Sequence, residues 1–273
     1  MDDVGLVEAE AFEPDSSLLV VHVAEAPAFA AGHIPGSVHV APAELVGGLP
    51  PATGRLPDPE RLNELFGRLG YRPDLEIVAY DDEGGGWGGR FLWTLDVIGH
   101  RRWRYLNGGI QAWVAAGRPV ERGAGRQPSP TSVALDIDSS PVAEAEDVLR
   151  AIDDPEQVIW DVRSLAEYRG ERRAAQRAGH VPGAVHLDWL DLKNPRDRQR
   201  LAPDVETLLG QRGITADKAV ITHCQTHHRS GLSYLVGRLL GFPRIRAYHG
   251  SWSEWGNRSD LPVATGGPEA TRG

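Results

Sequence analysis

The only cysteine in the 273-residue sequence lies in the stretch HCQTHHRS, residues 223–230. Histidines stand at positions 223, 227 and 228 around Cys224, and an arginine stands at 229. Cysteine and histidine are common zinc ligands, and a thiolate near an arginine can attack a phosphate ester or accept a sulfur atom. The residue types therefore leave three chemistries open: metal binding, phosphatase catalysis and sulfur transfer.

The residues on either side of Cys224 predict its position. Residues 219–222 predict a strand and residues 232–240 a helix, so the loop between them lies at the carboxyl end of a strand, where open α/β sheets bind ligands. Backbone N–H groups and the helix N-terminus favour an anion there. We expect Cys224 to be the nucleophile, with a binding loop made of Gln225, Thr226, His227, His228, Arg229 and Ser230.

Positive charge near Cys224 should lower the pKa of its thiol below the ordinary value of about 8.5. Arg229 supplies such a charge, as do His227 and His228 if protonated. The alternative, that Cys224 is a small buried core residue, is disfavoured because the polar residues 225–230 follow it. Alternatively, His227 and His228 are solvated loop residues. Because adjacent side chains rarely face the same way, the two are not expected to face the thiol together.

Neither a metal nor a cofactor is expected. Zinc sites need three or four protein ligands, and no second Cys-x-x-Cys or His-x3-His pair accompanies Cys224; the repeat described next explains His180 and His186 as structural. Glycines 84, 86 and 89 match the dinucleotide fingerprint, but no acidic residue follows about twenty positions on. A nicotinamide-dependent oxidoreductase is therefore a weak alternative.

The elements around Cys224 belong to the second copy of an internal repeat. Residues 32–39 (GHIPGSVH) recur as residues 179–186 (GHVPGAVH), and an apolar strand precedes each copy, at 18–23 and 158–162. A strand at 76–80 and a helix at 90–98 repeat the order of 219–222 and 232–240. We predict an α/β fold of two tandem domains, each with a largely parallel central sheet flanked by helices.

Length and composition agree with two globular domains. The chain has 41% hydrophobic and 25% charged residues, and residues 118–130 have the glycine, proline and arginine content of a linker. The predicted boundaries are an N-terminal domain at 1–120, a linker at 121–140, a C-terminal catalytic domain at 141–265 and a flexible tail at 266–273.

The charge and the apolar runs restrict location and partners. A formal net charge of −9 argues against binding to nucleic acid or to an anionic membrane. No apolar run approaches the roughly 18 residues of a membrane span, and the acidic start does not look like a secretion signal. We expect a cytoplasmic protein with a free thiol and no nucleic-acid or membrane partner.

The combined pattern resembles that of the tandem-domain rhodaneses. The shared features are the two Gly-His-Ile/Val-Pro-Gly segments, residues 161–163 (DVR) and 167–170 (EYRG), one cysteine loop in the second repeat, and residues 250–255 (GSWSEW). The likeness covers about residues 15–263, and the loop is similar to that of the bacterial Azotobacter-type rhodaneses. It implies a thiosulfate:cyanide sulfurtransferase in which Cys224 carries a persulfide, Arg229 orients the sulfonate of thiosulfate, and cyanide, a thiol or an acceptor protein removes the sulfur.

Three related activities remain as alternatives. Rhodanese-like phosphatases have five residues between cysteine and arginine, whereas four separate Cys224 from Arg229, which favours a sulfur atom over a phosphate. The loop also differs from that of the mercaptopyruvate sulfurtransferases, and Glu167 stands where that branch carries a substrate-binding arginine. A mercaptopyruvate sulfurtransferase, a protein persulfide carrier and, less favoured, a phosphatase are the other candidates.

The first repeat is expected to be catalytically inactive. Asp82 occupies the register of Cys224, and a carboxylate cannot accept sulfur. The acids at 81–83 would also repel an anionic donor. We expect this half to form a wall of the cleft above Cys224, with Trp87 as a candidate wall residue.

Overall fold

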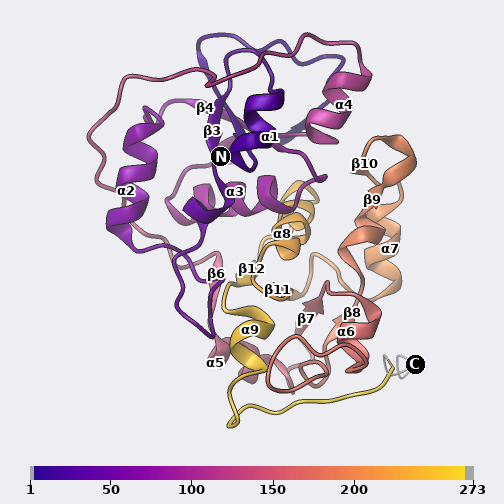
Figure 1. Cartoon of the computed structure of the whole chain (residues 1–273). Helices are drawn as coiled ribbons and strands as arrows, with labels where there is room; N and C mark the ends of the chain where they lie inside the picture. Colours follow the sequence, from indigo (N-terminus) through magenta and orange to yellow (C-terminus); the bar gives the residue numbers. More distant parts are fainter. Residues whose placement is uncertain (1–2, 268–273) are drawn as a thin grey trace.

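A computed structural model of the chain describes residues 3–267 and contains two α/β halves (Figure 1). The first half has a five-stranded, fully parallel sheet in the order β1-β5-β4-β2-β3. Its strands are β1 Asp3–Val7, β2 Leu18–Val23, β3 Val38–Val40, β4 Glu76–Asp81 and β5 Arg102–Leu106. Its helices are α1 Ala26–Ala31, the short η1 Pro42–Leu45, α2 Pro59–Arg68, α3 Gly86–Val97 and α4 Gly109–Ala115.

The second half repeats this arrangement with the sheet order β6-β12-β11-β7-β8, again fully parallel. Its strands are β6 Val142–Ala143, β7 Gln157–Asp161, β8 Val185–His186, β11 Ala219–His223 and β12 Ile245–Tyr248; a small antiparallel pair, β9 Lys193–Asn194 and β10 Arg200–Leu201, stands apart. Its helices are α5 Ala145–Ala151, α6 Leu165–Arg169, η2 Trp189–Leu192, η3 Pro195–Asp197, α7 Val205–Gln211, α8 Arg229–Leu239 and α9 Ser251–Trp255. The predicted fold class is confirmed.

The helices that follow the two equivalent loops begin earlier than predicted. Helix α3 starts at Gly86 instead of residue 90, and α8 starts at Arg229 instead of residue 232. The glycines and polar residues at both starts carry no apolar periodicity, so the sequence pattern did not show the first turn of either helix. As a result, Arg229 belongs to the helix that follows the cysteine loop.

The two halves dock through these same helices, which lie side by side between the two sheets (Figure 1). A Cβ atom added at Gly89 would lie 2.3 Å from the carbonyl oxygen of Gly231, and one added at Gly231 would lie 2.4 Å from that of Gly86. The backbones approach too closely for any side chain at the crossing. Because each helix starts at the end of its loop, this crossing brings the two loops together.

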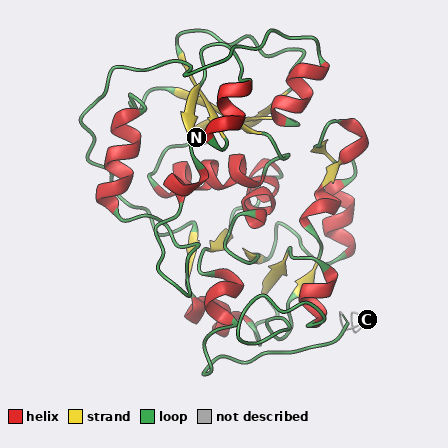
Figure 2. Ribbon diagram, in the orientation of Figure 1, coloured by secondary structure: helices red, strands yellow, loops and turns green. Residues whose placement is uncertain are grey.

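The segment between the halves, residues 116–141, forms no helix or strand and runs along the outside of the first half (Figure 2). Backbone hydrogen bonds hold it there: Glu121 pairs with His33, Arg126 N–H donates to Ser37, and Asp138 N–H donates to Val97. The domain boundaries given above remain predictions, and most of the tail, residues 268–273, lies outside the described residues. Within residues 3–267, no helix has the length and apolar character needed to cross a membrane.

Candidate active site

Cys224 directly follows β11 and is almost fully buried, with 1% of its surface exposed. The loop that it begins is held from outside by Ser251. The Ser251 hydroxyl oxygen accepts hydrogen bonds from the backbone N–H groups of Cys224 (3.3 Å) and His227 (3.1 Å) and donates to the carbonyl oxygen of Tyr248 (2.9 Å). Sequence reasoning missed this role of Ser251.

Two carbonyl groups of the loop accept hydrogen bonds from outside it, whereas four of its N–H groups stay free. Trp252 N–H donates to the Cys224 carbonyl (3.0 Å) and Ser253 N–H to the Gln225 carbonyl (2.9 Å). Within residues 3–267, no acceptor bonds four N–H groups of the loop, those of Gln225, Thr226, His228 and Arg229. Unpaired donors beside a buried thiol form a binding site for an anion.

The surroundings of Cys224 favour its thiolate. Burial raises the pKa of the thiol, but the charge of Arg229, hydrogen bonds from the hydroxyl and N–H of Ser230, and the nearby His228 outweigh burial, so the pKa lies below its ordinary value. The predicted direction of this shift is confirmed. These surroundings therefore shift the enclosed Cys224 thiol toward its thiolate form.

Arg229 is not a free cation, because it forms a bidentate ion pair with Glu167. Its two terminal nitrogens donate to the two carboxylate oxygens at 2.7 and 2.9 Å. Burial alone would raise the pKa of Glu167, but Arg229 and Ser164, which caps α6, hold that pKa down at about 2. The pair links α6 to the first turn of α8, so the arginine is fixed beside the thiol.

His227 is fully buried and takes no part as a cation. Its backbone has a positive φ of 54°, its Nδ1 atom bonds the Ser230 hydroxyl (2.8 Å), and its ring meets the edge of Trp93 from the first half (centroid distance 4.5 Å). Burial, with the nearby charge of Arg90, holds the pKa of His227 well below its ordinary value. The sequence left the protonation of His227 open, and the buried position favours the neutral form; the residue packs the loop against the first half.

His228 points the other way, toward the mouth of the loop. Its ring stacks on Trp87 (centroid distance 4.4 Å, interplanar angle 19°) and its Nε2 atom contacts the Glu83 carboxylate. Trp189 of the second half lies 5.8 Å from the same ring. The structure thus brings Trp87 of the first half against the Cys224 loop, and its place in a cleft wall stays a prediction.

Three further residues of the first half support the loop, and sequence reasoning missed them: Arg90, Trp93 and Gly54. The buried guanidinium of Arg90 donates to the carbonyls of Gly54 (2.9 Å) and Leu45 (2.7 Å) and lies 4.6 Å from the centre of the Trp93 ring. Burial lowers the pKa of Arg90 to about 9. A Cβ atom at Gly54 would lie 2.2 Å from the carbonyl oxygen of Thr226, so the backbones touch. No local pattern in the sequence signals these contacts.

The equivalent loop of the first half is already occupied. The Asp81 carboxylate accepts N–H bonds from Gly84 (3.0 Å), Gly85 (2.9 Å) and Gly88 (2.8 Å), and a longer one from Glu83. Asp82, which aligns with Cys224, is exposed instead. Asp82 thus stands in the register of Cys224, as predicted, but its neighbour Asp81 fills the loop, so the N–H groups that a dinucleotide would need are taken.

The repeated histidines have structural roles. His33 and His180 each bond a backbone carbonyl through Nδ1, and each stacks on an aromatic ring, Phe29 or Tyr168. Among residues 3–267, no group of three or more His, Cys, Asp or Glu side chains is placed to hold a metal ion.

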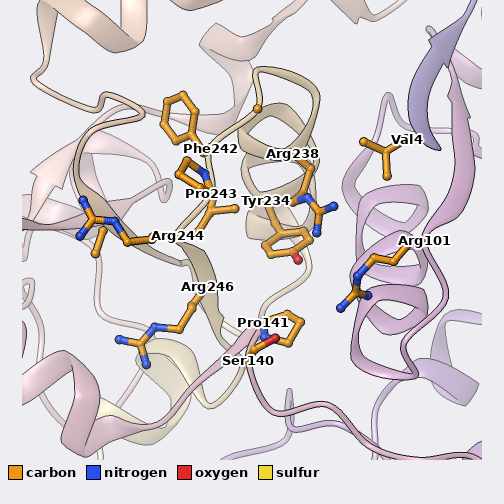
Figure 3. Close-up of a pocket in the computed structure, with 13 residues that line it drawn as sticks. Val4, Arg101, Ser140, Pro141, Tyr234, Arg238, Phe242, Pro243, Arg244 and Arg246 are labelled. Atoms are coloured by element: carbon orange, nitrogen blue, oxygen red, sulfur yellow. The ribbon is translucent and has the colours of Figure 1, made fainter. Parts of the chain in front are cut away.

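A cavity of about 510 Å³ lies between the halves at the amino ends of β11 and β12, opposite the end that carries Cys224 (Figure 3). Arginine side chains surround it: Arg101, Arg238, Arg244 and Arg246. Three of them are already paired with carboxylates, those of Asp96, Asp138 and Asp147. The cavity is therefore remote from the thiol, and most of the positive charge around it is neutralised by carboxylates.

Comparison with curated proteins finds close similarity to named sulfurtransferases. The chain is 48% identical over 248 residues to thiosulfate sulfurtransferase of Azotobacter vinelandii and 46% identical over 248 residues to that of Pseudomonas aeruginosa, covering 90% of each chain in both cases. It is also 36% identical over 219 residues to the sulfur carrier protein TtuD of Thermus thermophilus, covering 76% of this chain and 77% of that one.

Among solved structures, the anaerobic ergothioneine biosynthesis enzyme of Chlorobium limicola has the same fold, with a TM-score of 0.86 and 23% identity over 96% of this chain and 70% of that one. YnjE gives a TM-score of 0.84 and 23% identity over 94% and 65%. The family model described as Rhodanese-like domain matches twice, at residues 8–116 and 144–258. The chain therefore belongs to the rhodanese family and carries two such domains in tandem.

Proposed function

We propose that the protein transfers the outer sulfur of thiosulfate to a thiophilic acceptor through a persulfide on Cys224. The observation that carries the proposal is the buried thiol with a lowered pKa beneath four free N–H groups. An anion-binding loop of this size around a single sulfur atom suits a persulfide better than a phosphate. The two relatives named thiosulfate sulfurtransferase support the choice of donor.

In the first half-reaction the Cys224 thiolate attacks the outer sulfur of thiosulfate. A new S–S bond forms at Cys224, the S–S bond of thiosulfate breaks, and its electron pair leaves with sulfite. The loop N–H groups of Gln225, Thr226, His228 and Arg229 stabilise the negative terminal sulfur, since they are oriented before the reaction. No oxidant or cofactor is needed.

In the second half-reaction the acceptor attacks the terminal sulfur. Cyanide forms thiocyanate, or a thiolate forms a new persulfide, and the electron pair of the broken bond returns to Cys224 as a thiolate. Arg229, together with Ser230, stabilises that thiolate. Because Glu167 occupies one edge of the Arg229 guanidinium, we assign Arg229 mainly to this role and only its remaining N–H groups to the sulfonate of the donor.

The proposal is tested by turnover with a panel of substrates. Thiosulfate with cyanide should give thiocyanate and sulfite in equal amounts, at a higher kcat/KM than mercaptopyruvate, and an aryl phosphate should not be hydrolysed. A higher kcat/KM with mercaptopyruvate would support a mercaptopyruvate sulfurtransferase instead. Release of phosphate from the aryl phosphate would support a phosphatase instead.

A second candidate function is a protein persulfide carrier, which the likeness to the Thermus sulfur carrier protein favours. Discharge of the persulfide to a protein thiol faster than to cyanide would support it. We also propose a cytoplasmic location, where the single thiol stays reduced; cell fractionation tests this.

A further inference from the structure

The two repeats differ in length at one place beside the catalytic loop. His33 bonds the carbonyl oxygen of Phe29, four positions before it, while His180 bonds that of Tyr168, twelve positions before it. Each histidine also stacks on the aromatic ring of the residue whose carbonyl it bonds, so the two sites correspond. The catalytic repeat therefore carries eight additional residues between α6 and Gly179.

This addition is strongly basic. Residues 169–177 (RGERRAAQR), here named the arginine segment, contain four arginines and one glutamate in a chain whose net charge is −9. Arg169, Arg172 and Arg173 are exposed. Within residues 3–267, the segment's arginines have a single carboxylate partner, Glu171, at 3.9 Å from Arg169. The positive charge is therefore available to a partner.

The arginine segment is held firmly against the catalytic loop. The side-chain amide of Gln225, the residue after the nucleophile, donates to the Ala174 carbonyl at 3.0 Å. Arg172 N–H donates to Ala166 (2.9 Å), and Arg177 donates both from its backbone to Gly256 (2.9 Å) and from its guanidinium to the carbonyls of Trp255 and Leu261. These bonds fix the segment at one side of the loop.

On the opposite side of the loop, acidic and basic side chains lie together. There the first half supplies Glu83, which contacts His228, and the Lys193 ammonium of the second half donates to the Glu83 carbonyl. The excess of positive charge beside the loop therefore lies on the Gln225 side. A charged partner that approaches the thiol is oriented by this difference.

We propose that the arginine segment recruits the sulfur acceptor, a thiol on an acidic protein segment. The inference rests on the proposed function, since the acceptor receives the sulfur of the Cys224 persulfide: its thiolate bonds the terminal sulfur, the S–S bond to Cys224 breaks, and Cys224 leaves as a thiolate. Thiosulfate is small and reacts at the buried thiol, where the loop N–H groups act. A protein acceptor must rest on the rim, where the exposed arginines lie.

The test uses the double variant R172E/R173E and two synthetic peptides, one with a cysteine flanked by glutamates and one with glutamines in their place. Enzyme loaded from thiosulfate is mixed with each peptide, and kcat/KM for discharge is measured at low and high salt. The wild type should prefer the acidic peptide, and the variant should lose about tenfold with that peptide only. The loss should shrink as salt increases, because salt screens exposed charges.

The matched control is R61E/R122E, which changes the net charge equally at two exposed arginines, Arg61 in α2 and Arg122 in the connecting segment. It should behave as wild type. Loading from thiosulfate and discharge to cyanide should be unchanged in R172E/R173E. An equal loss with both peptides, a loss in loading of the same size, or a wild type with no preference for the acidic peptide would overturn the proposal. A wild type that fails to load from thiosulfate would overturn the proposed function instead.

Discussion

The two loops that follow β4 and β11 have the same place in their sheets and opposite contents. In the first half the Asp81 carboxylate occupies the ring of backbone N–H groups. In the second half the N–H groups of Gln225, Thr226, His228 and Arg229 near Cys224 stay free within the described residues, while that of His227 bonds Ser251. The same fold therefore either neutralises its own anion site or keeps it open for a ligand.

A second difference lies behind each loop. Gly109 and Ser251 occupy equivalent positions with positive φ values of 56° and 52°. At Gly109 a Cβ atom would lie 2.2 Å from the Asp81 carbonyl oxygen, whereas the Ser251 hydroxyl holds two N–H groups of the catalytic loop. The catalytic half accepts an unfavourable backbone conformation at Ser251 and gains a fixed loop.

The largest difference between the halves should appear at the aligned positions 224 and 82. Cys224→Ser should lower kcat for thiosulfate:cyanide transfer by about 10³-fold or more, because the hydroxyl is a much weaker nucleophile at neutral pH. Asp82→Ala should change kcat less than about twofold, since Asp82 is exposed and outside the ring. Steady-state assays with circular dichroism as a folding control compare the two. A large loss in Asp82→Ala would mean that the first half takes part in the chemistry.

The filled loop of the first half should contribute stability rather than activity. Asp81→Asn puts an N–H₂ group among N–H donors, so the free energy of unfolding should fall by about 2–3 kcal/mol. Asp82→Asn is the control and should stay within about 0.5 kcal/mol. Urea denaturation measures both. Loss of turnover in folded Asp81→Asn protein would contradict a purely structural role.

Replacing Ser251 by glycine gives the second half the residue that the first half has at the equivalent position, Gly109. Ser251→Gly and Ser251→Ala should both lower kcat/KM for thiosulfate by about tenfold, because the N–H groups of Cys224 and His227 lose their acceptor. The glycine variant should be more stable than the alanine variant by about 1 kcal/mol, since glycine adopts a positive φ freely. Parallel kinetics and thermal unfolding separate the two effects, and full activity in Ser251→Ala would rule out the positioning role.

The smallest effect concerns the ion pair that only the catalytic half has. The pKa of Glu167 is about 2 in the folded protein, below its ordinary value of 4.5, so the pair stabilises the fold above about pH 4.5 and this stabilisation disappears as the pH falls toward 2. Glu167→Gln should lower the free energy of unfolding at pH 7 by about 1 kcal/mol and make its fall below pH 5 less steep. Denaturant titrations at pH 7, 5 and 3.5 measure this. An identical pH dependence in both proteins would contradict the pairing.

The sequence predicted the features that depend on local pattern. The repeat of residues 32–39 at 179–186 indicated two α/β domains, and an apolar strand before Cys224 with a helix after it placed the thiol at the carboxyl end of β11. Periodicity and spacing are sufficient for such conclusions, since strand and helix patterns are local.

The sequence did not predict features that depend on packing between distant residues. Burial beside Trp93 and the charge of Arg90, both in the other half, hold the pKa of His227 well below its ordinary value, and Arg229 is paired with a glutamate 62 positions away. Of three consecutive acids at 81–83, only the folded loop shows that Asp81 turns inward. The burial of His227 depends on the docking of α3 on α8, and the other two outcomes depend on contacts within each folded half; no local pattern records them.

The most direct test of the central claim is the intact mass of the protein after incubation with thiosulfate and removal of excess donor. The open loop around Cys224 predicts a gain of one sulfur atom per chain in the wild type, its loss on addition of cyanide, and no gain in Cys224→Ser. An unchanged mass in folded wild-type protein, or a gain that persists in Cys224→Ser, would contradict the account.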